Sequence, residues 1–305
     1  MVKGHKIVGG RRYLLAGEAL EAAALTGGLY LVATPIGNLR DISLRALETL
    51  AAADIIACED SRVTRKLTEH YGIATPLTSY HEHNAAAARP KILARLADGQ
   101  AVALVSDAGT PLISDPGYKL VRAACEAGYQ VIAVPGASAV LTALAAAGLP
   151  TDRFFFEGFL PPKHVARQKR IAELGLIPAT LVLFESGARL PAALADLAAE
   201  LGPRPAAICR ELTKLHEEIR RSDLETLAHH YKAGAETRGE IVIVISPPGE
   251  DAGKTGDVDD LLRRALSRVS VKDAVGEVAL ATGRPRREVY QRALELTKDD
   301  GDGAP

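Results

Sequence analysis

The chain has 305 residues, of which 47% are hydrophobic and 25% are charged, and its formal net charge at pH 7 is −1. This composition is typical of a globular protein with sizeable cores, and the length predicts two or three domains. The near-neutral charge excludes a nucleic-acid binder that relies on a strong overall positive field, so a polyanion would have to be bound by a local basic patch.

The cysteines and the hydropathy pattern predict a cytoplasmic protein with no membrane segment. Cys58, Cys125 and Cys209 lie far apart in the sequence, which favours reduced thiols over a disulfide framework or a metal site. We expect all three to be small core residues. No apolar run approaches the roughly 20 residues that span a bilayer, and the first residues lack the long apolar segment of a secretory signal.

Short apolar runs alternate with longer amphipathic ones, which is the pattern of an α/β fold. Residues 1–28 precede this alternation and are predicted to be a loosely ordered, flexible extension with one helix around residues 16–25. In a first domain, residues 29–149, five strands with right-handed crossovers should form one parallel sheet. The predicted strands are 29–33, 54–58, 75–79, 101–105 and 130–134, and the helices between them begin near residues 43, 62, 85, 115 and 137.

A second α/β domain is predicted for residues 150–248, after Gly148-Leu149-Pro150. Its expected strands are 153–157, 180–184, 206–210, 217–221 and 240–246, and its helices are 163–174, 188–201 and 222–233. Residues 247–256 have the composition of a linker. A small helical domain, 249–298, should contain helices within 258–268 and 271–296, and the acidic, glycine-rich residues 299–305 are predicted to be disordered.

The longest predicted loop, V-S-D-A-G-T-P-L-I-S-D-P-G at residues 105–117, is composed mostly of turn-forming residues. It follows a buried strand, and open α/β sheets bind ligands at the carboxyl ends of their strands. An ordinary strand-to-helix connection is the alternative, but the length of this one favours a binding loop. The turn V-P-G-A-S-A, 134–139, offers small residues for close approach to a ligand or for helix–sheet packing.

The loop after the first strand, A-T-P-I-G-N-L-R-D-I-S at 33–43, is irregular but holds a single glycine, Gly37. A pyrophosphate-binding G-x-G-x-x-G loop needs several glycines, so the sequence disfavours a nicotinamide-dependent dehydrogenase. In Y-H-E-H-N, residues 80–84, two imidazoles and a carboxylate gather, but no third ligand stands at a matching spacing. A surface role beside the substrate is therefore favoured over a metal site.

Charged side chains follow several of the other predicted strands. C-E-D-S-R at 58–62 indicates either a functional pair of carboxylates or a helix start capped by Asp60 or Ser61. F-E-S-G-A-R at 184–189 and R-E-L-T-K at 210–214 indicate a site or salt bridges across a domain interface. A basic helix is either a solvated face or a phosphate contact, and its charged residues are Lys163, His164, Arg167, Lys169 and Arg170.

In this order and at these spacings, the motifs resemble those of the tetrapyrrole methylase superfamily, the class III S-adenosylmethionine-dependent methyltransferases. The motifs concerned are A-T-P-I-G-N-L, E-D-S-R, S-D-A-G-T-P-L-I-S-D-P-G, V-P-G-A-S-A, F-E-S-x-x-R and R-E-L-T-K. Within the superfamily, the chain is most similar to the bacterial enzymes that 2′-O-methylate the ribose of a cytidine in 16S ribosomal RNA. The resemblance covers about residues 29–246, and A-L-A-T-G-R-P-R-R-E-V-Y-Q-R-A-L resembles their small C-terminal domain. Ser61 stands where the family often has threonine.

The resemblance implies two α/β domains with S-adenosylmethionine bound in the cleft between them, and no metal. The implied donor contacts are Pro35, Asp107, Ala108, Gly109, Thr110, Pro111, Ile113, Ser138, Ala139, Glu185 and Leu212. The candidates for hydrogen bonding or proton transfer at the acceptor oxygen are Glu59, Asp60, Arg62, Arg210, Glu211 and Lys214. Glu59, Asp60 or a desolvated Lys214 could accept the proton. Arg62 and Arg210 could instead pair with carboxylates or bind a phosphate.

The implied partners are 16S ribosomal RNA in the assembled small subunit and a second copy of the chain. The basic residues of the helical end indicate either RNA contact or the polar face of a helical cap, and they are Lys272, Arg284, Arg286, Arg287 and Arg292. One alternative is a methyltransferase of the same fold that acts on a tetrapyrrole or another non-RNA acceptor. Another is a DNA-binding regulator, because residues 271–296 could form a helix-turn-helix.

Overall fold

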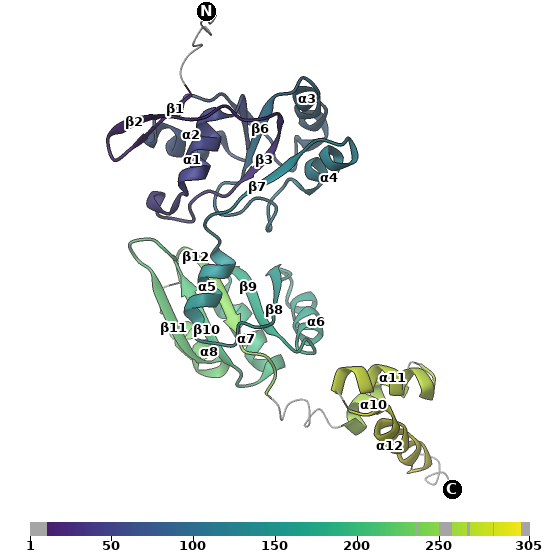
Figure 1. Ribbon diagram of the computed structural model, residues 1–305. Coiled ribbons are helices and arrows are strands. Elements are labelled where there is room, and N and C mark those ends of the chain that lie inside the picture. Colours follow the sequence, from purple (N-terminus) through teal and green to yellow (C-terminus); the bar gives the residue numbers. More distant parts are fainter. Residues whose placement is uncertain (1–10, 236, 250–257, 267–268, 283, 300–305) are drawn as a thin grey trace, which may run out of the picture. The chain divides into compact units, whose positions relative to one another are not determined.

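The computed structural model describes residues 11–235, 237–249, 258–266, 269–282 and 284–299 (Figure 1). The chain divides into two compact units. The first comprises residues 1–146, 209–219 and 239–242, and the second comprises 147–208, 220–238 and 243–305. Two short segments that the sequence assigns to the second α/β domain, 209–219 and 239–242, thus belong to the first unit.

The first sheet is parallel and has the order β5-β4-β6-β3-β7. Its strands are β3 (Gly28–Val32), β4 (Ile55–Cys58), β5 (Leu77–Ser79), β6 (Ala101–Val105) and β7 (Val131–Val134). All residues of β4 and β6 are buried, as expected for parallel strands that are covered on both faces. The predicted five-stranded parallel sheet is therefore confirmed.

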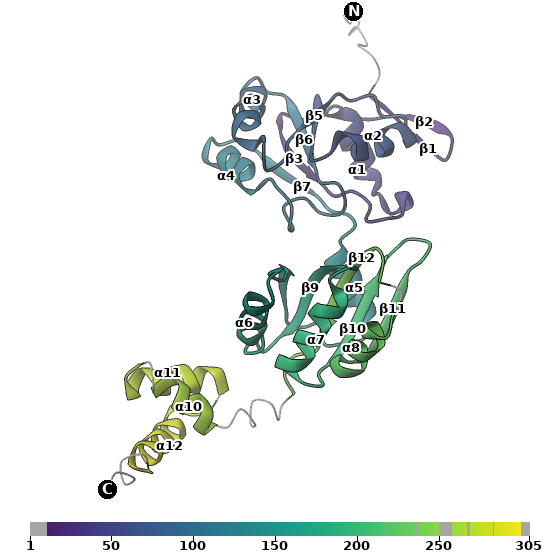
Figure 2. The same ribbon diagram turned by 180° about the vertical axis from the view of Figure 1, so that it is seen from behind.

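Helices cover both faces of this sheet, as both views show (Figure 1, Figure 2). Leu47 and Leu50 pack with Ile56 in one core cluster, and Ile92 and Leu120 pack in another. The helical elements between its strands are η1 (Leu39–Asp41), α1 (Leu44–Ala52), α2 (Ser61–His70), α3 (Ala85–Ala97) and α4 (Tyr118–Glu126). Helix α5 (Ala139–Ala147) follows β7 and contributes to neither of these two clusters.

The segment before the first sheet is a β-hairpin, so the helix predicted around residues 16–25 is wrong. Strands β1 (Arg12–Leu15) and β2 (Glu18–Glu21) pair antiparallel. The turn residues Ala16 and Gly17 both have positive φ, 52° and 88°, which suits a two-residue hairpin turn. Tyr13 is buried in the core of the first unit, so the hairpin is anchored. The rest of the predicted extension, 1–10, lies outside the described residues.

The second sheet has the order β11-β10-β12-β9-β8, and β8 and β9 run parallel. Its strands are β8 (Phe154–Phe159), β9 (Thr180–Ser186), β10 (Pro205–Arg210), β11 (Glu218–Asp223) and β12 (Glu240–Ile245). The helices are α6 (His164–Leu174), α7 (Leu190–Leu201) and α8 (Leu224–Lys232). Each strand and helix predicted here from the sequence is present, with bounds shifted by a few residues at most.

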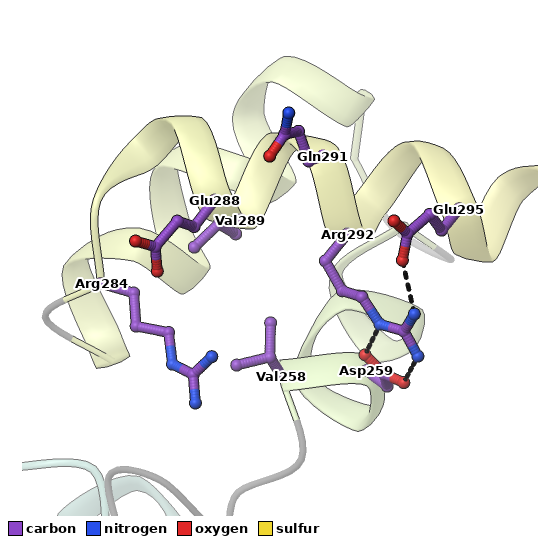
Figure 3. Close-up of a pocket in the computed structure, with 8 residues that line it drawn as sticks. All are labelled: Val258, Asp259, Arg284, Glu288, Val289, Gln291, Arg292 and Glu295. Carbon is purple, nitrogen blue, oxygen red and sulfur yellow. Dashed lines mark hydrogen bonds and ion pairs between the residues drawn. The ribbon is translucent and has the colours of Figure 1, made fainter.

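Three helices form the C-terminal part: α10 (Val258–Leu266), α11 (Val271–Thr282) and α12 (Arg286–Asp299). They share an apolar core that includes Leu262, Ala274 and Val289. Arg292 ties α12 to α10 through a bidentate ion pair with Asp259 (Figure 3). The predicted helical end is confirmed. Asp299 still belongs to α12, and the predicted tail beyond it and residues 250–257 of the predicted linker lie outside the described residues.

Two of the three cysteines are core residues, as predicted. Cys58 and Cys209 are buried, whereas Cys125 is exposed on α4. The prediction for Cys125 is wrong because only Leu120 and Ala124 of this helix are buried against the sheet. Within the described part of the chain, no helix has the length and apolar character needed to cross a membrane.

Candidate active site

The loops after β3 and β6 are joined through their backbones at the carboxyl edge of the first sheet. Thr34 N donates to Gly109 O (2.9 Å), and Gly109 N donates to Thr34 O (3.0 Å). The hydroxyl of Thr34 also donates to Ser106 O at 3.3 Å. These bonds place Pro35 and the residues from Asp107 to Gly109 side by side, as the predicted donor site requires.

The turn after β7 is tied to the same loops. Thr110 Oγ1 donates to Ala137 O at 3.2 Å, so Thr110 and Ser138 lie in neighbouring loops. The β6 loop also contains two non-glycine residues with positive φ, Leu112 (74°) and Ser114 (62°). Such a backbone conformation is unfavourable for a bulky side chain and persists only where the surrounding structure holds it. The strain is consistent with the predicted binding role of this loop.

Three carboxylates at this edge have no cationic partner: within the described residues, Glu59, Asp107 and Asp115 form no ion pair. Burial raises the pKa of Glu59, and the nearby Asp107 and Asp115 raise it further. Burial likewise raises the pKa of Asp115, with a contribution from Asp107. Like charges that crowd a half-buried site make each other harder to ionise, so this edge of the sheet favours a cationic ligand.

Asp60 and Arg62 form the start of α2. Asp60 is the N-cap residue, and its carboxylate accepts from Arg62 N at 2.8 Å and from Arg62 Nη2 at 2.6 Å. The hydrogen bonds to Arg62 lower the pKa of Asp60 to about 2. The helix-start interpretation thus accounts for Asp60, and a carboxylate that holds its proton so weakly is a poor base at neutral pH.

The R-E-L-T-K segment forms a network of charges around Lys214. Lys214 Nζ lies 2.8 Å from Glu211 Oε1 and 3.0 Å from Glu240 Oε2. Burial lowers the pKa of Lys214, but hydrogen bonds to the two carboxylates outweigh it, and the net pKa is raised. A desolvated, neutral Lys214 that accepts a proton is therefore not favoured. Arg210 pairs with Glu218 at 3.2 Å, as the sequence allowed.

A pocket of about 250 Å³ opens where these loops meet. It brings together Pro35, Asp107 and Ala108 of the predicted donor set with Lys214 of the predicted polar set. All of its lining residues belong to the first unit. They are Thr34, Pro35, Ile36, Gly37, Leu39, Val63, Thr64, Lys66, Leu67, Ser106, Asp107, Ala108, Lys214 and Glu240.

The remaining predicted contacts lie outside the lining of this pocket. In the first unit these are the donor contacts Gly109, Thr110, Pro111, Ile113, Ser138, Ala139 and Leu212 and the polar residues Glu59, Asp60, Arg62, Arg210 and Glu211. Glu185 belongs to the second unit, at the end of β9. It is buried, its Oε1 accepts from Ser186 N at 2.8 Å, and its Oε2 has no hydrogen-bond partner. The same Oε1 lies 3.3 Å from Nε of Arg189, so an ion pair within the F-E-S-G-A-R motif balances the buried charge of Glu185.

Gly37, Lys66 and Glu240 line the pocket but were not among the predicted site residues. For Gly37, a signal existed in the sequence, because it is the one glycine in an irregular loop after a strand. Glu240 gave no signal, because it is the first residue of a strand and its partner Lys214 is 26 positions away.

The basic helix differs from both of its expected roles, whereas the surface role predicted for the histidine loop stays a prediction; Glu82 and His83 are exposed. In the basic helix α6, Arg167 is buried and pairs with Asp196 (2.6 Å), and Arg170 pairs with Glu157 (2.6 Å). Neither interpretation of that helix, a solvated face or a phosphate contact, describes these two arginines. In the histidine loop, the buried Nδ1 of His81 has no hydrogen-bond partner. The described residues contain no group of three or more metal-ligating side chains.

Comparison with known proteins shows which family the chain belongs to. Residues 28–228 match the tetrapyrrole (corrin/porphyrin) methylases. The ribosomal RNA small subunit methyltransferase I of Mesorhizobium japonicum is 51% identical over 285 residues, which cover 93% of this chain and 97% of the relative. The chain belongs to the tetrapyrrole methylase family, in the branch of the ribosomal RNA small subunit methyltransferases I. Residues 252–297 match the C-terminal helix-turn-helix domain of that branch.

Solved structures of this family share the fold. A cobalt precorrin-4 methyltransferase from cobalamin biosynthesis aligns with a TM-score of 0.55 at 18% identity, over 72% of this chain and 94% of its own. The uroporphyrin-III C-methyltransferase of Thermus thermophilus, solved in complex with S-adenosylhomocysteine, aligns with a TM-score of 0.50 at 20% identity, over 72% and 97%. Membership of this family argues against a dehydrogenase and a DNA-binding regulator, although the helix-turn-helix interpretation of residues 271–296 agrees with the match over residues 252–297.

Proposed function

We propose that the chain is an S-adenosylmethionine-dependent methyltransferase that modifies the ribose 2′-oxygen of a cytidine in 16S ribosomal RNA. The observation that carries this proposal is the joined set of loops at the carboxyl edge of the first sheet, with their pocket, in a chain 51% identical to a small-subunit ribosomal RNA methyltransferase. The substrate is proposed to be the assembled small subunit. The cytoplasmic location and a homodimer are parts of the same proposal.

The residues at this edge fit the methyl donor. S-adenosylmethionine carries a cationic sulfonium and an ammonium but no phosphate, so it needs carboxylates, backbone groups and an apolar wall rather than a glycine-rich phosphate loop. The unpaired Glu59, Asp107 and Asp115 supply negative charge. Pro35, Ala108 and Gly109 allow close approach of a ligand. The donor, when bound, supplies an electrophilic methyl group.

The transfer is an in-line displacement in which the ribose 2′-oxygen forms a bond to the methyl carbon, and the carbon–sulfur bond breaks to leave a neutral thioether. The hydroxyl proton must leave with the attack. Alignment of the reacting atoms is generally worth about 7–11 kcal/mol, and a positioned base adds about 10²–10⁴-fold. Glu59 is the proposed base, because it is half-buried, forms no ion pair in the described structure, and has a raised pKa.

The RNA would be held partly by the C-terminal helices. In Figure 3, Arg284 is joined to none of the other side chains drawn, whereas Arg292 is held by Asp259 and by Glu295 at 2.6 Å. Arg287 is exposed and has no ion pair in the described residues. Arg284 and Arg287 are therefore the proposed phosphate contacts of this part. The 2′-hydroxyl itself makes the enzyme selective for RNA over DNA.

The experiment that tests this function supplies tritiated S-adenosylmethionine and offers three acceptors: small ribosomal subunits, naked 16S RNA and free tetrapyrroles. We expect label in the subunits, with mass spectrometry of nuclease digests locating the added methyl on a cytidine ribose. Equal labelling of free tetrapyrroles would favour the alternative acceptor. Label on a base, or no label in subunits, would contradict the proposal.

A further inference from the structure

Two glycines make room for the charge network around Lys214. A β-carbon at Gly37 would overlap the aliphatic part of the Lys214 side chain, and a β-carbon at Gly239 would overlap the carboxylate of Glu211. Each glycine thus lies directly against one member of the Lys214–Glu211 pair. We call Gly37, Glu211, Lys214, Gly239 and Glu240 the clamp; all five belong to the first unit.

The clamp is also fixed through the backbone. Glu211 N donates to Glu240 O (2.9 Å), and Glu240 N donates to Glu211 Oε1 (2.9 Å). Glu211 and Thr213 adopt positive φ, 51° and 66°, which is unfavourable for residues with a β-carbon. This conformation brings the same Glu211 carboxylate within reach of both Glu240 N and Lys214 Nζ. A strained backbone persists only where its surroundings hold it in place.

The geometry points to Lys214 as a positioning residue that holds the turn Pro35–Ile36–Gly37 in place as the wall of the donor pocket, an inference that rests on the proposed function. The lysine stem packs on Gly37, the ammonium is anchored by Glu211 and Glu240, and Pro35 and Lys214 line the same pocket. The side chain acts through its contact with the turn. It neither takes the proton from the acceptor nor replaces Glu59 in that role.

A double-mutant cycle tests the contact between Gly37 and Lys214. The four proteins are the wild type, Gly37→Ala, Lys214→Ala and the double variant, and calorimetry measures their affinity for S-adenosylhomocysteine. We expect each single change to weaken binding by about five- to tenfold, which corresponds to the usual coupling between residues in contact. The double variant should bind no more weakly than either single one, because both changes release the same turn.

Matched controls isolate the contact from the chemistry of the substitutions. Lys91→Ala removes an exposed lysine on α3, and Gly249→Ala adds a methyl group where nothing lies within 4 Å. Both should leave the affinity within twofold of the wild type. If the two losses of affinity multiply in the double variant, to about 25- to 100-fold, the inference is overturned. Unchanged affinity in Lys214→Ala would also overturn it.

Two further measurements separate the clamp from the proposed function. Hydrogen exchange of the amides in residues 34–42 should become faster in Lys214→Ala than in Lys91→Ala, whether or not the protein methylates RNA, and equal exchange would refute the clamp. The pH dependence of methylation should keep its acid limb in Lys214→Ala. Loss of that limb would mean that Lys214 itself takes the proton. If the wild type binds the donor but labels no subunits, the proposed function is refuted. The affinity and hydrogen-exchange measurements would still test the clamp in that case.

Discussion

Gly109→Ala is the substitution that most directly tests the joined loops. Gly109 has φ +76°, and an added β-carbon would lie 3.2 Å from Cγ2 of Ile36. Gly99 offers a matched control, because it has φ +74° and nothing within 4 Å of the added carbon. The left-handed backbone costs an alanine about 1–2 kcal/mol at either position. At Gly109 the crowding of Ile36 adds about 1–3 kcal/mol, a typical cost of overpacking.

Urea unfolding should therefore show that Gly109→Ala destabilises the protein by at least about 1 kcal/mol more than Gly99→Ala. The binding of S-adenosylhomocysteine should separate the two variants further. Gly109 forms two backbone hydrogen bonds with Thr34, so its displacement moves the donor loops. Gly99 lies between α3 and the amino end of β6, whereas the site lies at the carboxyl end of that strand. Equal donor affinity in the two variants would refute the role assigned to the Thr34–Gly109 bridge.

Burial raises the pKa of Glu59 above its ordinary 4.5, and only the ionised form is a base, so wild-type methylation should rise with pH through that raised pKa; Glu59→Gln should lose this limb and about 10²–10⁴-fold in rate. The double variant Arg284→Glu/Arg287→Glu should bind the small subunit more weakly and leave the donor affinity unchanged. The slope of log affinity against log salt concentration should fall by about one for each phosphate that the variant no longer binds. Cys125 should react with a maleimide in the native protein, while the two buried cysteines react only after unfolding.

The sheets were predictable because their strands are short and continuously apolar between turn-forming segments. Ala101–Val105 is an uninterrupted apolar run, and every one of its residues is buried, so pattern and burial agree. The same pattern fixes the loops at the carboxyl edge, since parallel strands all end on one side. The assignment of Pro35, Asp107 and Thr110 to a donor site rests instead on the resemblance of their motifs to those of the tetrapyrrole methylases.

The hairpin before the first sheet escaped prediction for a local reason. Two-residue hairpin turns are usually recognised by Asn-Gly or Asp-Gly, but here Ala16 occupies a positive-φ position beside Gly17. Alanine favours helices strongly, so the local sequence indicates the wrong element. Burial of Tyr13 against the core stabilises the hairpin, and a tertiary contact of that kind is not encoded within the segment itself.

The partners in the ion pairs also could not be predicted from the sequence. Arg167 and Asp196 are 29 residues apart, and Lys214 and Glu240 are 26 apart, so neither partner is visible from the local motif. Counting charges in a motif therefore overstates how many remain available to a ligand. In α6, where the basic cluster suggested phosphate binding, Arg167 and Arg170 are already neutralised by carboxylates.

The charged side chains that form no internal ion pair can be compared with the two proposed ligands, the methyl donor and the RNA. At the edge of the first sheet, where Arg62 and Lys214 are held by carboxylates, the described charges that remain unpaired include Glu59, Asp107 and Asp115. Lys66 also lines the pocket and has no ion pair in the described residues, so the unpaired charge there is negative on balance, which suits a sulfonium donor. In the C-terminal helices, pairing of Arg292 with Asp259 leaves Arg284 and Arg287 exposed for an anion. The reacting ribose must still reach Glu59 at that edge, so Arg284 and Arg287 would bind the flanking phosphates and offset the cost of bringing a polyanion towards carboxylates.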